Sequence, residues 1–322
     1  MARSRFYFIL LLFITRLLLT IFAKRAMPTF NPNIHCLWLL AVVTAACHTP
    51  QQAAAPAYSL TDFKSLLWEL SGNGLKKPSY LYGTIHLIPQ RDYFMTDLAL
   101  QKMQTAKQLC LEIDIDDPAT NAAALKGVMT DGKMLRDIMP ADDYAYLTQA
   151  LADKNIAILT VRRLKPLLIS ALLLERTATE PMVSYENKFV ALARTQHKEI
   201  VGLESAESQM SLLDSIPYNV QARMLLAELR NGSSHTQLTE IIRLYKIQDI
   251  DAIHAYTRAQ SQEVARFECL LLETRNRNWL SGIIAKATEK STFFAVGAAH
   301  LGGENGIIRL LRQQGYQVRP LF

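Results

Sequence analysis

The chain has 322 residues, half of them hydrophobic, which is enough to bury a substantial core and excludes wholesale disorder. Residues 1–46 hold five of the 35 Lys and Arg residues and none of the 29 Asp and Glu residues. The rest of the chain, with 30 basic and 29 acidic side chains, is therefore nearly neutral. No stripe of basic residues with interleaved aromatics follows, so we expect no nucleic-acid partner.

Two apolar runs, residues 6–23 and 34–47, precede the main body of the chain. The first approaches the length of a membrane span but contains Arg16, and the second has the length of the apolar region of a secretory signal. The second run ends in small residues before Cys47, as in a bacterial lipoprotein signal whose cysteine is lipidated. Ordinary A-x-A cleavage, a start at Met27 and a retained membrane anchor are the alternatives. We expect an extracytoplasmic body, either periplasmic or anchored to the membrane.

The chain divides into a leader at residues 1–47, an alanine-rich tether at 48–61 and a body at 62–322. If Cys47 carries lipid, only Cys110 and Cys269 remain in the body. An oxidising compartment permits a disulfide between them, but two cysteines so far apart in sequence do not indicate a disulfide framework. We interpret them as buried free thiols.

Short apolar or β-branched runs bounded by turn residues predict strands at residues 65–69, 79–85, 108–115, 199–203, 292–296 and 316–321. Between the first two, Ser71-Gly72-Asn73-Gly74 indicates a hairpin. Helical periodicity covers residues 96–106, 143–153, 166–175, 183–196, 207–213 and most of 220–284.

Several of these strands are apolar throughout, which suits a sheet covered on both faces, and strand and helix signals alternate at both ends of the body. We therefore predict an α/β fold with a central mixed sheet flanked by helices. The helical tracts in between predict a large helical insertion in the middle of the chain.

Two of the predicted strands run into the same short motif. Residues 83–86 read Gly-Thr-Ile-His, residues 297–300 read Gly-Ala-Ala-His, and a leucine follows each. Ligands of such sheets gather beyond the carboxyl ends of strands, so we expect His86 and His300 to reach one crevice, with the glycines allowing close approach. A lone histidine at a strand end is most often structural, so two sheet-end hydrogen-bond partners remain the structural alternative.

Acidic residues lie on two further strands. Glu112 and Asp114 share one face of an otherwise apolar strand, and Glu204 follows another short strand. Buried acids need a positive partner, either a bound cation or a basic side chain.

Two histidines and a glutamate suit a divalent transition metal that lowers the pKa of a bound water and polarises a carbonyl group. Glu204 or Glu112 is then the candidate general base. The sequence has no H-E-x-x-H, C-x-x-C or phosphate-binding glycine loop, and it lacks the G-x-S-x-G motif of serine hydrolases.

Taken in order, these residues resemble the TraB/GumN family over about residues 62–322. The matching motifs are Gly83-Thr84-Ile85-His86, Leu111-Glu112-Ile113-Asp114, Gly202-Leu203-Glu204-Ser205, Arg275-Asn276 with Trp279, Gly297-Ala298-Ala299-His300, and Gly302-Gly303. That family is similar to the TIKI metalloproteases, so the resemblance implies His86, His300 and Glu112 as ligands of a divalent metal, manganese, cobalt or zinc. A wider group with erythromycin-esterase-like and haem-binding ChaN-like proteins implies an α/β core with its site at a strand-end cleft.

Arg275 lies in a predicted helix and matches the family arginine. We weigh two roles for it, a structural partner of a buried acid and a group that binds a substrate carboxylate or oxyanion. Glu304 precedes the last predicted helix, where we expect it to cap that helix. The remaining histidines of the body, which lack ligand-like companions and which we interpret as surface or core residues, are His197, His235 and His254.

The sequence therefore predicts an exported metal-dependent hydrolase, a peptidase with a peptide or protein substrate. Membrane contact would come through the leader or a lipidated Cys47. The alternative is a non-catalytic protein that retains a peptide, haem or another small ligand in the same cleft.

Overall fold

The computed structural model describes residues 64–322 except 118, 121–123, 131, 179, 232–233, 259–266 and 268. The predicted leader and tether lie outside the described residues. Within the described part of the chain, no helix combines the length and the apolar character needed to cross a membrane.

Six strands form the central sheet. They are β1 (Leu67–Ser71), β2 (Ser79–Thr84), β4 (Gln108–Ile113), β6 (Glu199–Glu204), β7 (Thr292–Gly297) and β8 (Gln317–Leu321). Their spatial order is β6-β4-β7-β2-β1-β8, in which the first four strands are parallel and β1 is antiparallel to both of its neighbours. The predicted mixed sheet is confirmed, and each strand lies within two residues of its predicted bounds.

The turn between β1 and β2 follows the predicted hairpin. Gly72, Asn73 and Gly74 have φ angles of 78°, 46° and 85°, which glycine and asparagine adopt most readily. The two strands pair antiparallel, with Leu70 opposite Ser79.

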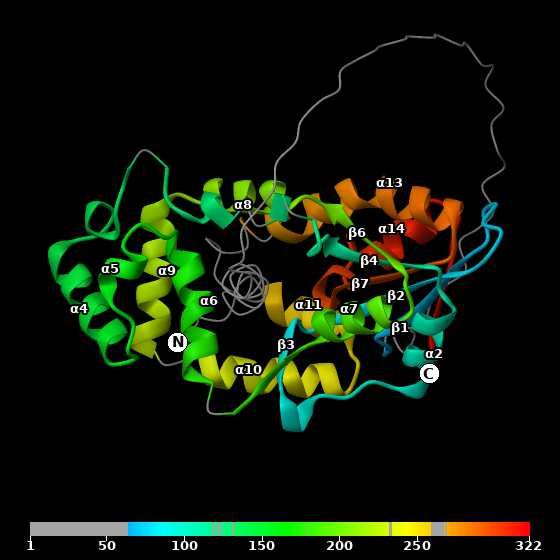
Figure 1. Cartoon of the computed structure of the whole chain (residues 1–322), viewed down its shortest axis with the longest axis horizontal. Coiled ribbons are helices and arrows are strands. Elements are labelled where there is room, and N and C mark those ends of the chain that lie inside the picture. Colours follow the sequence, from blue (N-terminus) through cyan, green and yellow to red (C-terminus); the bar gives the residue numbers. More distant parts are fainter. Residues whose placement is uncertain are drawn as a thin grey trace, which may run out of the picture.

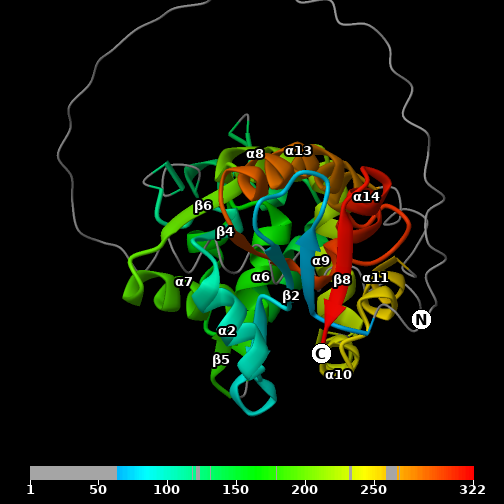
Figure 2. The ribbon, with the colours of Figure 1, turned by 90° about the vertical axis from the view of Figure 1, so that its right-hand side faces the viewer.

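Helices cover both faces of the sheet, and a further group of helices lies beside it (Figure 1). They are α2 (Asp97–Thr105), α4 (Ala141–Ala152), α5 (Ile158–Val161), α6 (Pro166–Thr177), α7 (Tyr185–Thr195), α8 (Ala206–Asp214), α9 (Tyr218–Asn231), α10 (Ser234–Lys246), α11 (Ile250–Arg258), α13 (Thr274–Glu289) and α14 (Ile307–Gln313). In both views α13 and α14 lie above the sheet, with α2 and α7 below it (Figures 1 and 2). A separate group made of α4, α5, α6 and α9 lies to the left in Figure 1, beside the sheet, and contributes to the predicted helical insertion.

A second, two-stranded sheet was not predicted. It pairs β3 (Leu87–Pro89) with β5 (Met182–Ser184) in antiparallel register. The predicted start of a helix at residue 183 is therefore wrong, because α7 begins at Tyr185 and its N-cap is Ser184. Strands of three residues are too short to give a periodic signal, and only their pairing defines them.

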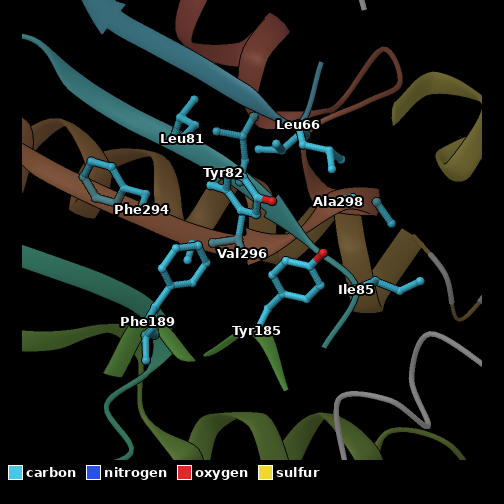
Figure 3. Close-up of a cluster of buried hydrophobic side chains, with 14 of the residues drawn as sticks. Leu66, Leu81, Tyr82, Ile85, Tyr185, Phe189, Phe294, Val296 and Ala298 are labelled. Carbon is cyan, nitrogen blue, oxygen red and sulfur yellow. The ribbon is translucent and has the colours of Figure 1, made fainter. Parts of the chain in front are cut away.

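The core between β2 and α7 is aromatic. Figure 3 shows Tyr82, Tyr185 and Phe189 gathered on one face of the sheet. The rings of Tyr82 and Phe189 meet edge to face, with their centroids 5.3 Å apart, an arrangement favoured by the charge distribution of aromatic rings. This packing fixes the start of α7 beside the end of β2, which matters for the site described below.

Two smaller predictions have opposite outcomes. Cys110 is a buried free thiol, as predicted, and burial raises its pKa. The prediction that Glu304 caps the last helix is wrong, because α14 begins at Ile307 with Gly306 as its N-cap. The Glu304 carboxylate is instead exposed, 3.7 Å from the Arg309 Nε atom.

Candidate active site

Four adjacent parallel strands each deliver one polar group at or just beyond their carboxyl ends. Across the sheet, β6 carries Glu204, β4 carries Glu112, β7 leads to His300 and β2 leads to His86. Arg275 enters this row from α13, above the sheet. The structure thus brings all five predicted site residues together, with His86, Glu112, Arg275 and His300 buried and Glu204 nearly so.

Glu112 lies at the centre of the cluster. Its Oε1 atom accepts the Gly297 N–H at 2.8 Å, just past the point where the β4–β7 pairing ends, and its Oε2 atom accepts Arg275 Nη2 at 2.8 Å. Burial alone would raise the pKa of Glu112, but the Arg275 guanidinium, the two imidazoles and the Gly297 N–H lower it to about 2. The carboxylate is therefore ionised.

Arg275 supplies the positive partner that the buried acids require. Besides Glu112, its Nη2 and Nε atoms donate to Glu204 Oε1 at 2.6 and 3.0 Å, and its guanidinium lies 4.4 Å from the Trp279 ring. Burial alone would lower the pKa of Arg275, yet the two carboxylates raise it. The Arg275 Nη1 atom also donates to Leu271 O at 3.3 Å, within the π-helix η5 (Cys269–Glu273) that precedes α13.

Glu204 closes the row on the β6 side. Its Oε1 atom accepts from Arg275, and its Oε2 atom accepts the Trp279 indole N–H at 3.1 Å. Burial raises the pKa of Glu204 although Arg275 opposes the shift. The two acids thus differ, because Glu112 is held firmly ionised and Glu204 is closer to neutrality.

The protonation of His300 is fixed by its neighbours. Asn276 Nδ2 donates to Asn305 O at 2.9 Å, which turns Asn276 Oδ1 toward His300, and the His300 Nδ1–H donates to that oxygen at 2.6 Å. The Nε2 atom therefore carries the lone pair, which accepts from Arg275 Nη1 at 3.2 Å. Burial first, and then the nearby Arg275 charge, lower the pKa of His300 to about 3, so the ring is neutral.

His86 is held by a carboxylate that lies 100 residues further along the chain. Its Nδ1–H donates to Glu186 Oε1 at 2.6 Å, and Glu186 also accepts from Thr84 Oγ1 at 2.7 Å and Ser184 Oγ at 3.1 Å. His86 has a φ of 47°, a left-handed conformation that costs a non-glycine residue about 1–2 kcal/mol. The strained backbone and the Glu186 bond together aim the ring back over the end of β7.

The donor chemistry of this cluster fits a divalent metal, although its present geometry is not that of a metal site. The Nε2 atoms of His86 and His300 lie 3.7 and 3.9 Å from Glu112 Oε1, too far for hydrogen bonds. Both Nδ1–H groups donate to oxygen, as is usual for metal-bound histidines. In the described part of the chain, however, no three His, Cys, Asp or Glu side chains are arranged to hold a metal ion. The Arg275 Nη1–H group donates a hydrogen bond to His300 Nε2, the atom whose lone pair would otherwise bind a metal ion.

Comparison with known proteins identifies the family of this chain. The model of the TraB/PrgY/gumN family matches residues 66–320. The chain belongs to this family. No solved structure matches it significantly.

Curated proteins similar to this family member are named metalloproteases. The metalloprotease TIKI2 of Xenopus tropicalis is 26% identical over 336 residues, covering 86% of this chain and 62% of that protein. The metalloprotease TIKI1 of Danio rerio is 23% identical over 315 residues, covering 80% of this chain and 63% of that protein. Human metalloprotease TIKI1 is 23% identical, covering 85% and 64%. The chain thus spans less than two thirds of the length of these relatives.

Sequence reasoning missed Glu186 and assigned no role to Asn276 or Trp279 of this TraB/PrgY/gumN member. Glu186 had a weak signal, a charged residue in the first turn of a helix whose neighbours Tyr185 and Phe189 are buried. Asp114, expected beside Glu112, lies beyond the end of β4, and its carboxylate accepts the Asp116 N–H. It is not part of the row.

Proposed function

We propose that this protein is an exported metal-dependent hydrolase that cleaves peptide bonds, with His86, His300 and Glu112 as ligands of a divalent ion. The observation that carries the proposal is that the Nε2 atoms of His86 and His300 both approach one ionised carboxylate oxygen of Glu112, while the Nδ1–H group of each ring donates to an oxygen that orients it. Bound there, a manganese, cobalt or zinc ion would supply a Lewis acid that polarises the scissile carbonyl.

Arg275 and Glu204 have roles on the β6 side of the same row. The Arg275 guanidinium carries a charge in a buried setting, where it would stabilise negative charge developing on a substrate oxygen. Glu204, whose pKa is raised by burial, would accept a proton from the attacking water more readily near neutral pH than an exposed glutamate. For a metal to bind, the Arg275 Nη1 atom and the His300 Nε2 atom must separate.

The names of the similar proteins support a substrate class. Because the similar proteins are named metalloproteases, we propose a peptide or protein substrate, reached in an extracytoplasmic compartment, periplasmic or membrane-anchored. Anchoring would use the leader or a lipidated Cys47. Cell fractionation of the full chain and a Cys47→Ser variant tests this point, since loss of membrane association in the variant is expected only for lipid attachment at that cysteine.

The metal site has a direct test. Protein purified without chelators is analysed for bound metal in the parent chain, in His86→Ala and in His300→Ala, with the exposed His197→Ala as the matched control. We expect metal to be lost from the first two variants and retained in the control. Unchanged stoichiometry in both site variants would remove the proposed ligand set.

One observation favours a second function, a non-catalytic protein that retains its ligand. Arg275 already contacts Glu112, Glu204 and His300, and these contacts oppose metal binding at the same atoms. Incubation with a broad peptide library and added manganese, cobalt or zinc separates the two functions. New peptide termini support the hydrolase, whereas a ligand that stays bound through purification without turnover supports the binding protein.

A further inference from the structure

The Gly302-Gly303 pair that follows His300 has no role in the proposed chemistry, and its surroundings explain it. A Cβ atom on Gly302 would collide with Ile250 O, and one on Gly303 would collide with the His254 ring. Both obstacles belong to α11. The glycine pair therefore lets α11 pack directly against the turn that carries His300.

Helix α11 holds this turn by hydrogen bonds on both sides of His300. The His254 Nδ1–H donates to Ala299 O at 3.1 Å, immediately before His300. On the other side, Asp251 Oδ1 accepts the Gly303 N–H at 2.8 Å, and the Asp251 carboxylate is itself fixed by Arg309. Because His254 is buried, its bond to Ala299 O is shielded from water and holds its geometry more firmly than an exposed one.

The preceding helix, α10, holds the other histidine turn. Tyr245 is fully buried, and its hydroxyl donates to Gly83 O at 2.9 Å, three residues before His86. The loop between α10 and α11 adds a second path, since Gln248 Oε1 accepts the Leu66 N–H at 3.3 Å and Leu66 O accepts the Gly83 N–H at 2.8 Å. One helical hairpin thus contacts both Gly-x-x-His turns.

We propose that the α10–α11 hairpin sets the separation of the two imidazoles, with Tyr245 and His254 as positioning residues. A small cavity supports this arrangement, because it is lined by both histidine turns and by Ile241, Tyr245 and Ile253 of the two helices. The inference rests on the proposed function, which makes that separation important. The contacts themselves do not depend on any activity.

The expected signature is coupling between the two sides. If one hairpin holds both turns, removing a contact to either turn shifts both imidazoles, whereas independent supports would shift only the nearer one. Tyr245→Phe removes a single hydroxyl on the His86 side. His254→Leu removes the donor on the His300 side, and His254→Asn retains a donor close to the position of Nδ1.

The test uses nuclear magnetic resonance of metal-free, ¹⁵N-labelled full chain at one neutral pH, with ring signals assigned from His86→Gln and His300→Gln. We expect Tyr245→Phe and His254→Leu each to shift the Nδ1–H signals of both site histidines upfield, and His254→Asn to restore them. Thr257→Val, which removes a buried hydroxyl that donates to Ile253 O within α11, is the matched control and should leave both signals unchanged.

Shifts confined to the nearer histidine, or no shifts at all, would overturn the proposal. If Tyr245→Phe does not fold, the two His254 variants still test the proposal. His254→Leu must shift the signals of both site histidines, and His254→Asn must restore them. The result is also separable from the proposed function. If the parent chain neither binds metal nor cleaves peptides, the proposed hydrolase function is refuted. The imidazole signals would still show whether the α10–α11 hairpin positions both histidines.

Discussion

Gly297→Ala places one methyl group in the space between the proposed ligands. A Cβ atom there would lie 3.2 Å from His86 Nε2, 3.4 Å from Glu112 Oε1 and 3.6 Å from His300 Cδ2. The Gly297 backbone, at φ −55° and ψ 135°, suits alanine, and the N–H that donates to Glu112 is retained. The substitution therefore acts on the space between the donor atoms and leaves the backbone bonds in place.

Two opposing terms set the effect on stability. Reduced freedom of the unfolded chain favours alanine by about 0.4–1 kcal/mol, and the crowded methyl costs about 1–3 kcal/mol. We expect the free energy of unfolding to fall by about 0–2.5 kcal/mol, so the protein stays folded. Metal affinity should fall by at least about tenfold, because the His86 ring must move away from Glu112 to make room.

Isothermal titration with manganese, cobalt or zinc, together with urea unfolding, measures both quantities. Gly83→Ala is the control, because its Cβ atom would lie 3.0 Å from the Cα and Cβ atoms of Ala298 and away from the donor atoms. It should lower stability as much as Gly297→Ala or more, with a smaller effect on metal affinity. A folded Gly297→Ala protein that binds metal as the parent does would refute the proposed ligand geometry.

Three further predictions concern the same cluster. Arg275→Met leaves two buried acids without their cation and should lower the free energy of unfolding by about 3–5 kcal/mol in urea; an unchanged value would contradict the ion pairs. Glu186→Gln should weaken metal binding by about 10- to 100-fold in titration calorimetry, whereas Glu180→Gln, remote from His86, should not.

The third prediction concerns pH. Metal-free protein should lose stability as pH falls from about 6.5 toward 3, because His300, with a pKa lowered to about 3, stays neutral in the folded protein while the unfolded chain takes up a proton. His300→Gln should flatten that slope, and His197→Gln should not.

The central sheet was readable from sequence because its signals are local. Each parallel strand is a largely apolar run with a glycine or an acid among its last two residues, and the hairpin turn is specified by Gly72 to Gly74. The expectation that His86 and His300 meet required only the general rule that sites in such sheets form beyond the carboxyl ends of the strands. Strand order itself had no local signal, because it depends on which apolar faces pack together.

The partners of the histidines could not be predicted, because they come from distant parts of the chain. Glu186 reaches His86 only because three-residue strands pair and the aromatic cluster seats α7 beside β2. The sequence left two cations open for Glu112, a metal or a basic side chain. The choice of Arg275 depends on how α13 docks, and α13 is positioned by packing that no single segment encodes.

The order of the strands explains why position 297 is glycine. His86 follows β2 and Glu112 belongs to β4, and β7 lies between these strands, so their backbones are roughly 10 Å apart. Yet His86 Nε2 lies 3.7 Å from Glu112 Oε1, so the imidazole must cross the end of β7. The left-handed backbone at His86 turns the ring in that direction, and it passes over Gly297, where any side chain would stand in its path. The two glycines of the repeated motif thus have different roles. Gly83 allows the end of β2 to lie against Ala298. Gly297 keeps open the space in which His86, His300 and Glu112 meet.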